Sequence, residues 1–159
     1  MILVKKTGKP FWQVAFFVFV FLNIMTLVHE LGHYVALELF GCDPDIPQVW
    51  FYFGATTFSC EGADITPKQW WIIAYAGPAA AFLIAYYLWT KMGKDSIWRL
   101  AALVGFVYGV LPNLVWQIRG TDAYFAVSTG FPPALATFVM VSALSFIAYL
   151  IYREIAELE

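Results

Sequence analysis

The two histidines of this chain lie four residues apart in the stretch VHELGHYVALELFG (residues 28–41), and Glu30 follows the first of them. In an α-helix, residues four apart share one face, so His29 and His33 can direct two ring nitrogens at one metal ion. Glu30 then lies on the flank of the pair, where it can take a proton from a metal-bound water. In this HExxH pattern zinc lowers the pKa of its water and polarises the scissile carbonyl, and the glutamate is the general base. The spacing predicts a zinc site with His29 and His33 as ligands and Glu30 as the catalytic residue.

The elements that position these residues are predicted to be membrane helices. Of the 159 residues, 62% are hydrophobic and only 13% are charged, and the mean hydropathy is +0.72. Soluble globular proteins are much less apolar than this. The net charge of −2 gives no support for binding to nucleic acid or to an acidic partner. The chain is therefore predicted to be a membrane protein whose partners lie in the lipid bilayer.

Four apolar runs are long enough to cross a bilayer as helices of about 20 residues. They cover residues 11–40, 69–90, 97–117 and 132–152. The segment 43–66 is aromatic and β-branched, and it is either a short hairpin or edge strand at the membrane interface or an ordered aromatic loop at headgroup level. The predicted fold is an all-α multi-pass membrane protein, one domain over residues 1–159, with about four transmembrane helices and a β-hairpin-like interfacial segment after the first.

The histidines and the glutamate have an alternative explanation, in which they form a hydrogen-bonded polar cluster between helices. A charged or ionisable side chain at the centre of a membrane helix costs on the order of 3 kcal/mol, so three within two turns need a partner. A zinc ion is such a partner, and the pattern favours the metal site over the polar cluster.

A third metal ligand is expected near the membrane face opposite the N-terminus. His29 lies about 28 Å along a helix that starts at Pro10, close to the far edge of a hydrocarbon core about 30 Å thick. The third helix runs in the same direction and ends in the stretch LPNLVWQIRGTDAYF (111–125), which contains Asp122. Topology thus brings Asp122 to the depth of the histidines. The rival carboxylates near this face are Glu38, Asp43, Glu61 and Asp64.

Four residues are candidates for contacts with a substrate. Asn113 and Gln117 are four apart in the predicted third helix, where they either line a wet cavity and bind the substrate or make hydrogen bonds between helices. The aromatic segment 49–60, with Phe53 and Ala55, is suited to strand addition to an unwound substrate. Unwinding is needed because a helical substrate keeps its peptide bonds hydrogen-bonded and its carbonyls shielded from water.

Several motifs follow one another in a set order along residues 20–125. They are HELGH (29–33), Gly41 eight residues later, AYAGPAAAF (74–82) and an aspartate after a third helix that contains proline and asparagine. This order resembles the site-2 protease family of intramembrane zinc metalloproteases. The chain departs from the family in two places: Asp122 stands in TDA where the family usually has LDG, and Ala81 stands where an asparagine often follows AGP.

The resemblance implies a core of three helices that hydrolyses peptide bonds of membrane-embedded proteins. It assigns His29, His33 and Asp122 as the zinc ligands and Glu30 as the catalytic base. The expected function is that of an intramembrane zinc endopeptidase in the cell membrane, with a transmembrane protein as substrate. The alternative is a non-catalytic membrane protein on the same scaffold, which binds or chaperones transmembrane partners.

The orientation in the membrane is predicted from the basic residues. The face that carries the N-terminus has Lys5, Lys6, Lys9, Lys91, Lys94, Arg99 and Arg153, and the other face has Lys68 and Arg119. The positive-inside rule then places the N-terminus in the cytoplasm and the zinc site near the external leaflet. The family resemblance implies a site nearer the cytosol, and the prediction follows the charge distribution.

The two cysteines, Cys42 and Cys60, lie on the same face as the predicted metal site. If that face is extracellular, they can form a disulfide that fastens the interfacial segment to the end of the first helix. Two buried thiols are the alternative.

Overall fold

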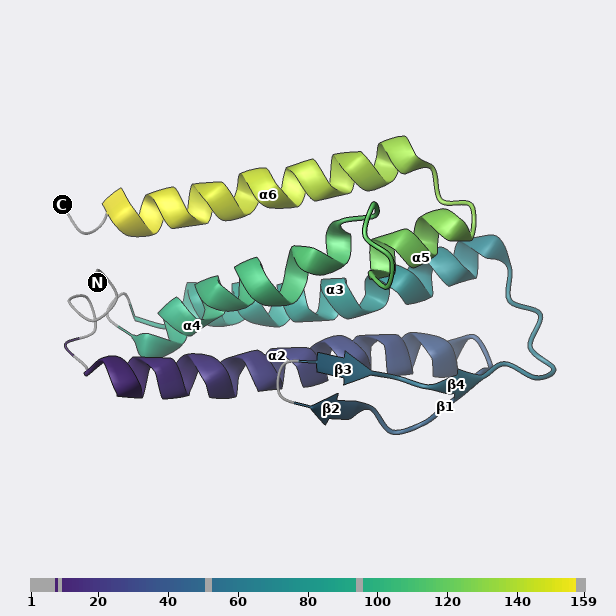
Figure 1. The fold of residues 1–159 in the computed structure, drawn as a ribbon, viewed down its shortest axis with the longest axis horizontal. Coiled ribbons are helices and arrows are strands. Elements are labelled where there is room, and N and C mark those ends of the chain that lie inside the picture. The colour runs from purple at the N-terminus through teal and green to yellow at the C-terminus, as the bar shows by residue number, and fades with distance from the viewer. Residues whose placement is uncertain (1–7, 9, 51–52, 94–95, 157–159) are drawn as a thin grey trace.

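The computed structural model describes residues 8, 10–50, 53–93 and 96–156. Figure 1 shows helices that lie side by side along one axis, with α2 (Phe11–Leu39) and α6 (Pro133–Ala156) on the outside and α3 (Pro67–Lys91) and α4 (Ile97–Gly105) between them. Within the described residues, α2, α3 and α6 are long and apolar enough to cross a membrane. The predictions of long apolar helices near 11–40, 69–90 and 132–152 are therefore confirmed.

The end of α2 is shaped by Gly41. The backbone N–H of Cys42 donates to the carbonyl of Leu37 at 3.0 Å and that of Gly41 donates to Glu38 at 3.0 Å, which is the Schellman pattern of helix termination. The pattern needs a residue in the left-handed region, and Gly41 has φ of 82°. The chain therefore turns back at once, and Cys42 is buried beneath the last turn of α2.

Helix α3 begins with a capping box and packs closely on α2. The Thr66 side chain accepts from the backbone N–H of Gln69, whose own side chain accepts from the backbone N–H of Thr66. Farther along, a Cβ on Gly32 of α2 would lie 2.5 Å from the carbonyl oxygen of Ala76. The absence of a side chain at Gly32 lets the two backbones approach, as small residues do between membrane helices.

The third predicted span, 97–117, is not one long α-helix, and this part of the prediction is wrong. Helix α4 passes into a π-helical turn η1 (Phe106–Val110) and then into a 3-10 turn η2 (Pro112–Leu114). The N–H of Leu111 reaches back five residues to the carbonyl of Phe106 at 3.4 Å, and Pro112 has no N–H to continue the ladder. After Leu114 the chain becomes extended at Val115, where φ is −87° and ψ is 90°.

The segment between α2 and α3 contains two short antiparallel pairs. Strand β1 (Asp43–Pro44) pairs with β4 (Phe58–Ser59), and β2 (Gln48–Trp50) pairs with β3 (Phe53–Ala55) in the register Gln48↔Ala55. A disulfide joins Cys42 to Cys60 at the base of the segment. The cysteines are thus paired, and the alternative of two buried thiols is wrong. We refer to residues 43–59 as the β-loop.

The apolar core lies between α2, α3, the α4–η1–η2 segment and α6. Its most buried large side chains include Phe21, Met25, Phe106 and Leu150, each at most 1% exposed. At the end that carries the start of α2, the buried side chains of Arg99 and Glu154 form an ion pair at 2.6 Å that links α4 to α6. The core fixes the relative positions of α2, α3 and the α4–η1–η2 segment.

Candidate metal centre

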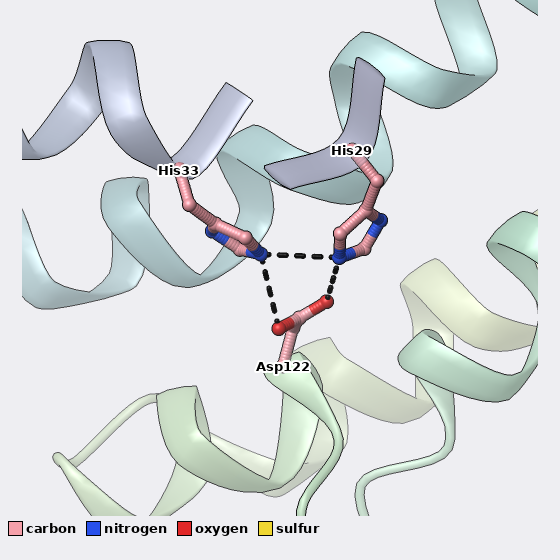
Figure 2. Close-up of side chains that lie close together, drawn as sticks. All are labelled: His29, His33 and Asp122. Atoms are coloured by element: carbon pink, nitrogen blue, oxygen red, sulfur yellow. Dashed lines mark hydrogen bonds and ion pairs between the residues drawn. The ribbon is translucent and has the colours of Figure 1, made fainter. Parts of the chain in front are cut away.

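Three side chains from two distant segments converge on one point (Figure 2). The Nε2 atoms of His29 and His33, both on α2, lie 3.1 Å apart. The carboxylate of Asp122, at the start of α5 (Asp122–Ser128), places Oδ2 at 3.0 Å from His29 Nε2 and Oδ1 at 3.2 Å from His33 Nε2. Within the described residues this is the group of histidine, cysteine and carboxylate side chains that could hold a metal ion.

The spacing of these atoms fits a divalent cation. Tetrahedral zinc ligands at about 2.0–2.1 Å from the metal lie about 3.3 Å from one another, close to the 3.1 Å between the two Nε2 atoms and to the 3.0 Å from His29 Nε2 to Asp122 Oδ2. Two imidazole nitrogens and one carboxylate oxygen also form a catalytic type of donor set, which leaves a fourth position open. Other divalent metals accept the same donors, so the geometry is not specific to zinc.

The backbone of α3 fixes the orientation of His33. Its Nδ1–H donates to the carbonyl oxygen of Ile73 at 2.7 Å. In the neutral ring this leaves the lone pair on Nε2, directed at the Asp122 carboxylate. Two acceptor atoms at 3.2 Å repel each other unless a cation or a proton lies between them. With Nδ1–H bonded to Ile73, the contact between Nε2 and the carboxylate therefore needs either a metal ion or a proton on the ring at the centre of the group.

Asp122 is positioned by the N-terminus of α5. The Thr121 side chain caps this helix by accepting from the backbone N–H of Tyr124 at 3.1 Å, and its hydroxyl also lies 2.9 Å from the Val115 carbonyl. Burial works against the charged carboxylate, but the adjacent imidazoles of His29 and His33 outweigh it, so the pKa of Asp122 is lowered from its ordinary value. Asp122 is therefore held in the ionised form that a metal ligand requires.

Gly77 leaves the space that the two imidazoles occupy. A Cβ on this residue would lie 2.8 Å from Nε2 of His29 and would also contact Nε2 of His33. Only a glycine on this face of α3 lets both rings reach Asp122. The structure thus shows a close approach of α3 to both histidines at Gly77.

We expect Gly77→Ala to lower the affinity for zinc by roughly 10–100-fold, the range seen when supporting residues of a metal site are changed. The added methyl group must displace at least one imidazole. Gly93→Ala is the matched control, because a Cβ there meets nothing within 4 Å. Zinc titration of both purified variants in detergent checks the prediction, and equal affinities would contradict it.

Glu30 lies beside the group and is covered by the β-loop. Glu30 is 7% exposed, and the Thr56 hydroxyl lies 2.9 Å from its Oε2. A Cβ on Gly54 would lie 2.5 Å from Cγ of Glu30, so the β3 backbone covers this side chain directly. Glu30 is not a member of the three-residue metal group.

A cavity of about 820 Å³ opens onto both the metal group and Glu30. Its polar lining includes Asn113, and its apolar lining includes Phe58, Ile73 and Phe125. The cavity lies between α2, the β-loop, α3, η2 and α5, so its wall includes both the metal group and the glutamate.

The predicted substrate residues lie in different places. Asn113 and Ala55 line the cavity. Gln117 is exposed and lines a separate pocket with Trp116, and the prediction that it shares a helix face with Asn113 is wrong because the helix ends at Leu114. Phe53 belongs to β3 by its backbone, and its side chain lies outside the described residues.

The rival carboxylates are not brought to the histidines in the described structure. Glu38 is exposed and accepts from the Tyr34 hydroxyl at 2.9 Å, and Asp43 is exposed in β1. Glu61 and Asp64 lie outside the metal group. Neither Thr56 nor Gly54 was predicted as a site residue, because nothing in the sequence around them marks Glu30 as their neighbour.

In comparisons with known proteins, no family model, no curated protein and no solved structure matches this chain.

Proposed function

We propose that this chain is an intramembrane zinc endopeptidase of the cell membrane, distantly related to the site-2 proteases, that cleaves transmembrane proteins. One observation carries the proposal: His29, His33 and Asp122 converge within 4.8 Å at a cavity that Glu30 also lines. The chain that holds this group has three helices long enough to cross a bilayer. The order of the HELGH, AGP and aspartate motifs supports the same function.

Each residue of the site has a separate proposed role in peptide hydrolysis. A zinc ion, when bound by His29, His33 and Asp122, supplies Lewis acidity that polarises the scissile carbonyl and lowers the pKa of water. Glu30 takes a proton from the attacking water and delivers it to the leaving amine nitrogen as the C–N bond breaks. Asn113 lines the cavity and offers an amide for hydrogen bonds to the substrate backbone.

The shape of the site favours an extended substrate. An α-helix with its side chains is about 10 Å wide and keeps its carbonyls hydrogen-bonded. A cavity of about 820 Å³ lies in the range of sites that hold a ligand of drug size, about 300–1,000 Å³. It therefore accommodates a few unwound residues of a transmembrane segment, with the β-loop at its side. The α4–η1–η2 segment forms another wall of the cavity through η2, and we propose that it crosses the bilayer as a fourth, irregular segment.

The metal site is proposed to open to the outside of the cell. The Cys42–Cys60 disulfide follows the last turn of α2 and closes the β-loop, and Figure 1 shows the β1–β4 pair and α5, which begins with Asp122, toward the end of the molecule opposite the start of α2. Disulfides persist in oxidising compartments. Lys91 ends α3, Arg99 lies in the first turn of α4 and Arg153 lies in the last turn of α6. Figure 1 shows these three helix ends at the same end of the molecule as the start of α2, which the positive-inside rule assigns to the cytoplasm. The disulfide and the distribution of basic residues thus favour the same orientation of the chain in the membrane.

Metal removal tests both the function and the orientation. Sealed right-side-out vesicles would contain the chain and a single-span reporter protein with a fluorophore at each end. We expect 1,10-phenanthroline, which crosses membranes, and EDTA, which does not, each to abolish cleavage, and added zinc to restore it. The purified chain is expected to hold about one zinc ion.

The outcomes test the proposed enzymatic function and the proposed orientation of the site separately. Inhibition by phenanthroline alone would place the site on the cytoplasmic side and leave the enzymatic function intact. Cleavage that resists both chelators would overturn the metalloprotease. A zinc-loaded wild-type chain that binds the reporters and cleaves none of them would favour the non-catalytic binding protein.

A further inference from the structure

We propose that Thr56 is a positioning residue for the general base: its hydroxyl holds one oxygen of Glu30 and directs the other to the reacting water. The inference rests on the proposed function, because it assigns a role to Thr56 in that reaction. Thr56 acts through Glu30 and need not contact the substrate.

The contact between the two residues is specific. The Thr56 Oγ1 lies 2.9 Å from Glu30 Oε2 and 3.3 Å from the backbone oxygen of Glu30, across 26 residues of sequence. The hydroxyl has one proton, and the shorter contact leads to a charged acceptor, so the carboxylate is its principal partner. Oε2 is thus held by the β-loop, and Oε1 remains to accept the proton.

Gly54 restrains the same side chain from a second direction. A Cβ at this position would lie 2.8 Å from Oε1 of Glu30 as well as 2.5 Å from its Cγ. The β3 backbone therefore touches the glutamate where any larger residue would displace it. Thr56 and Gly54 flank Ala55, which lines the cavity. Together they limit Glu30 to few of the rotamers that a free glutamate samples.

The β-loop is itself fastened to α2, the helix that carries Glu30. The Cys42–Cys60 disulfide and the β1–β4 pair close its base. One residue beyond Thr56, the Thr57 carbonyl accepts from the backbone N–H of Asp45 at 2.8 Å. The hydroxyl of Thr56 is therefore held at a fixed place relative to Glu30. Such fixed placement of a catalytic group is a recognised source of rate enhancement.

The test compares three variants of the full chain, each zinc-loaded in detergent and supplied with the same fluorescent transmembrane reporter. Thr56→Val keeps the shape and removes the hydroxyl, and we expect kcat to fall about 10–100-fold with KM and zinc content unchanged. Thr56→Ser restores the hydroxyl and is expected to restore kcat. Thr57→Val is the matched control, because the neighbouring hydroxyl contacts Asp45 and not Glu30.

A second measurement does not depend on activity. In metal-free protein, amide hydrogen exchange of residues 54–57 is expected to be several-fold faster in Thr56→Val than in wild type, and faster than in Thr56→Ser. A wild-type kcat in Thr56→Val would overturn the role of Thr56 and leave the proposed function intact. A loss of zinc in that variant, or a serine variant as slow as the valine variant, also overturns it. A wild-type chain that cleaves no reporter overturns the proposed function, and the inference falls with it.

Discussion

Asp122→Ala is expected to lower the affinity for zinc by at least about 100-fold, more than the loss from a supporting residue, because a direct ligand disappears. Asp122 contacts both imidazoles, and it is the one carboxylate in the metal group of the described chain. Without it, His29 and His33 offer two neutral donors, which is too few for a tight zinc site. Zinc content by atomic spectrometry and titration against a chelating dye measure the loss.

Two comparisons make the Asp122 prediction specific. Asp122→Asn preserves the shape and removes the charge, and its zinc affinity should fall almost as far, because an amide oxygen is a weaker ligand. Glu61→Ala and Asp64→Ala remove rival carboxylates outside the group and should bind zinc as wild type does. If Asp122→Ala keeps its zinc while one of the rival variants loses it, the ligand assignment is wrong.

The metal group was predictable because its geometry follows from short-range periodicity and from membrane topology. Four-residue spacing on a helix brings His29 and His33 together, as Figure 2 shows. Asp122 was predicted from its depth, since a second chain segment that runs in the same direction ends on the same face, and from the order of motifs that resembles the site-2 proteases. The exact route was not predicted: Asp122 starts a separate helix, α5, after a turn closed by the Thr121 cap.

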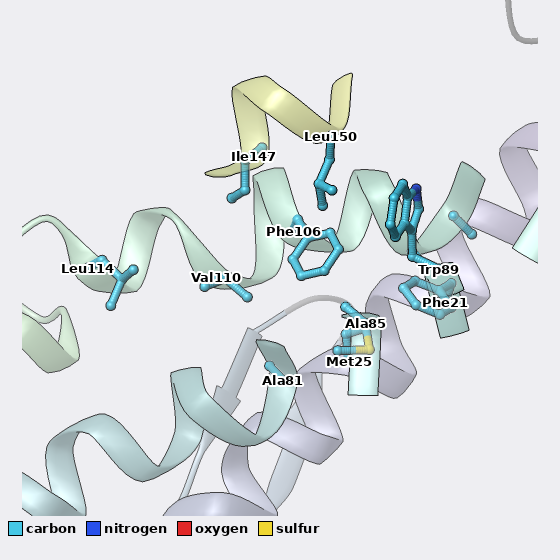
Figure 3. Close-up of a cluster of buried hydrophobic side chains, with 12 residues drawn as sticks. Phe21, Met25, Ala81, Ala85, Trp89, Phe106, Val110, Leu114, Ile147 and Leu150 are labelled. Atoms are coloured by element: carbon cyan, nitrogen blue, oxygen red, sulfur yellow. The ribbon is translucent and has the colours of Figure 1, made fainter. Parts of the chain in front are cut away.

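The third span was mispredicted because hydropathy does not report backbone geometry. Residues 97–117 contribute many apolar side chains to the core, and Phe106, Val110 and Leu114 all pack into the cluster shown in Figure 3. Pro112 lies inside that run, and its missing N–H ends the regular ladder. The irregular backbone is the reason that Asn113 and Gln117, four residues apart, point to different pockets.

Contacts between distant segments could not be predicted from the sequence. Thr56 and Glu30 are 26 residues apart, and neither residue type marks the other as a partner. The contact of Gly77 with the histidines likewise depends on how α3 packs against α2. The disulfide was left open because its formation depends on the compartment as well as on the spacing of Cys42 and Cys60.

Glu30→Gln is expected to lower kcat by roughly 10²–10⁴-fold while zinc stays bound, because an amide of the same shape cannot accept the proton. Glu30 is not among the metal ligands, so its loss of charge leaves the donor set complete. The Thr56 hydroxyl can still donate to the amide oxygen of glutamine, so the β-loop keeps its place. Reporter cleavage and zinc content are measured on the same preparation.

The matched control for this variant is Glu38→Gln on the same helix. Its exposed carboxylate accepts from the Tyr34 hydroxyl and is not brought to the metal group, so the variant should cleave reporters at the wild-type rate. Loss of zinc in Glu30→Gln would make Glu30 part of the metal site instead of the base. Undiminished cleavage would mean that another group removes the proton, and among the side chains that line the cavity the carboxylate of Asp122, the proposed metal ligand, would be the first to test.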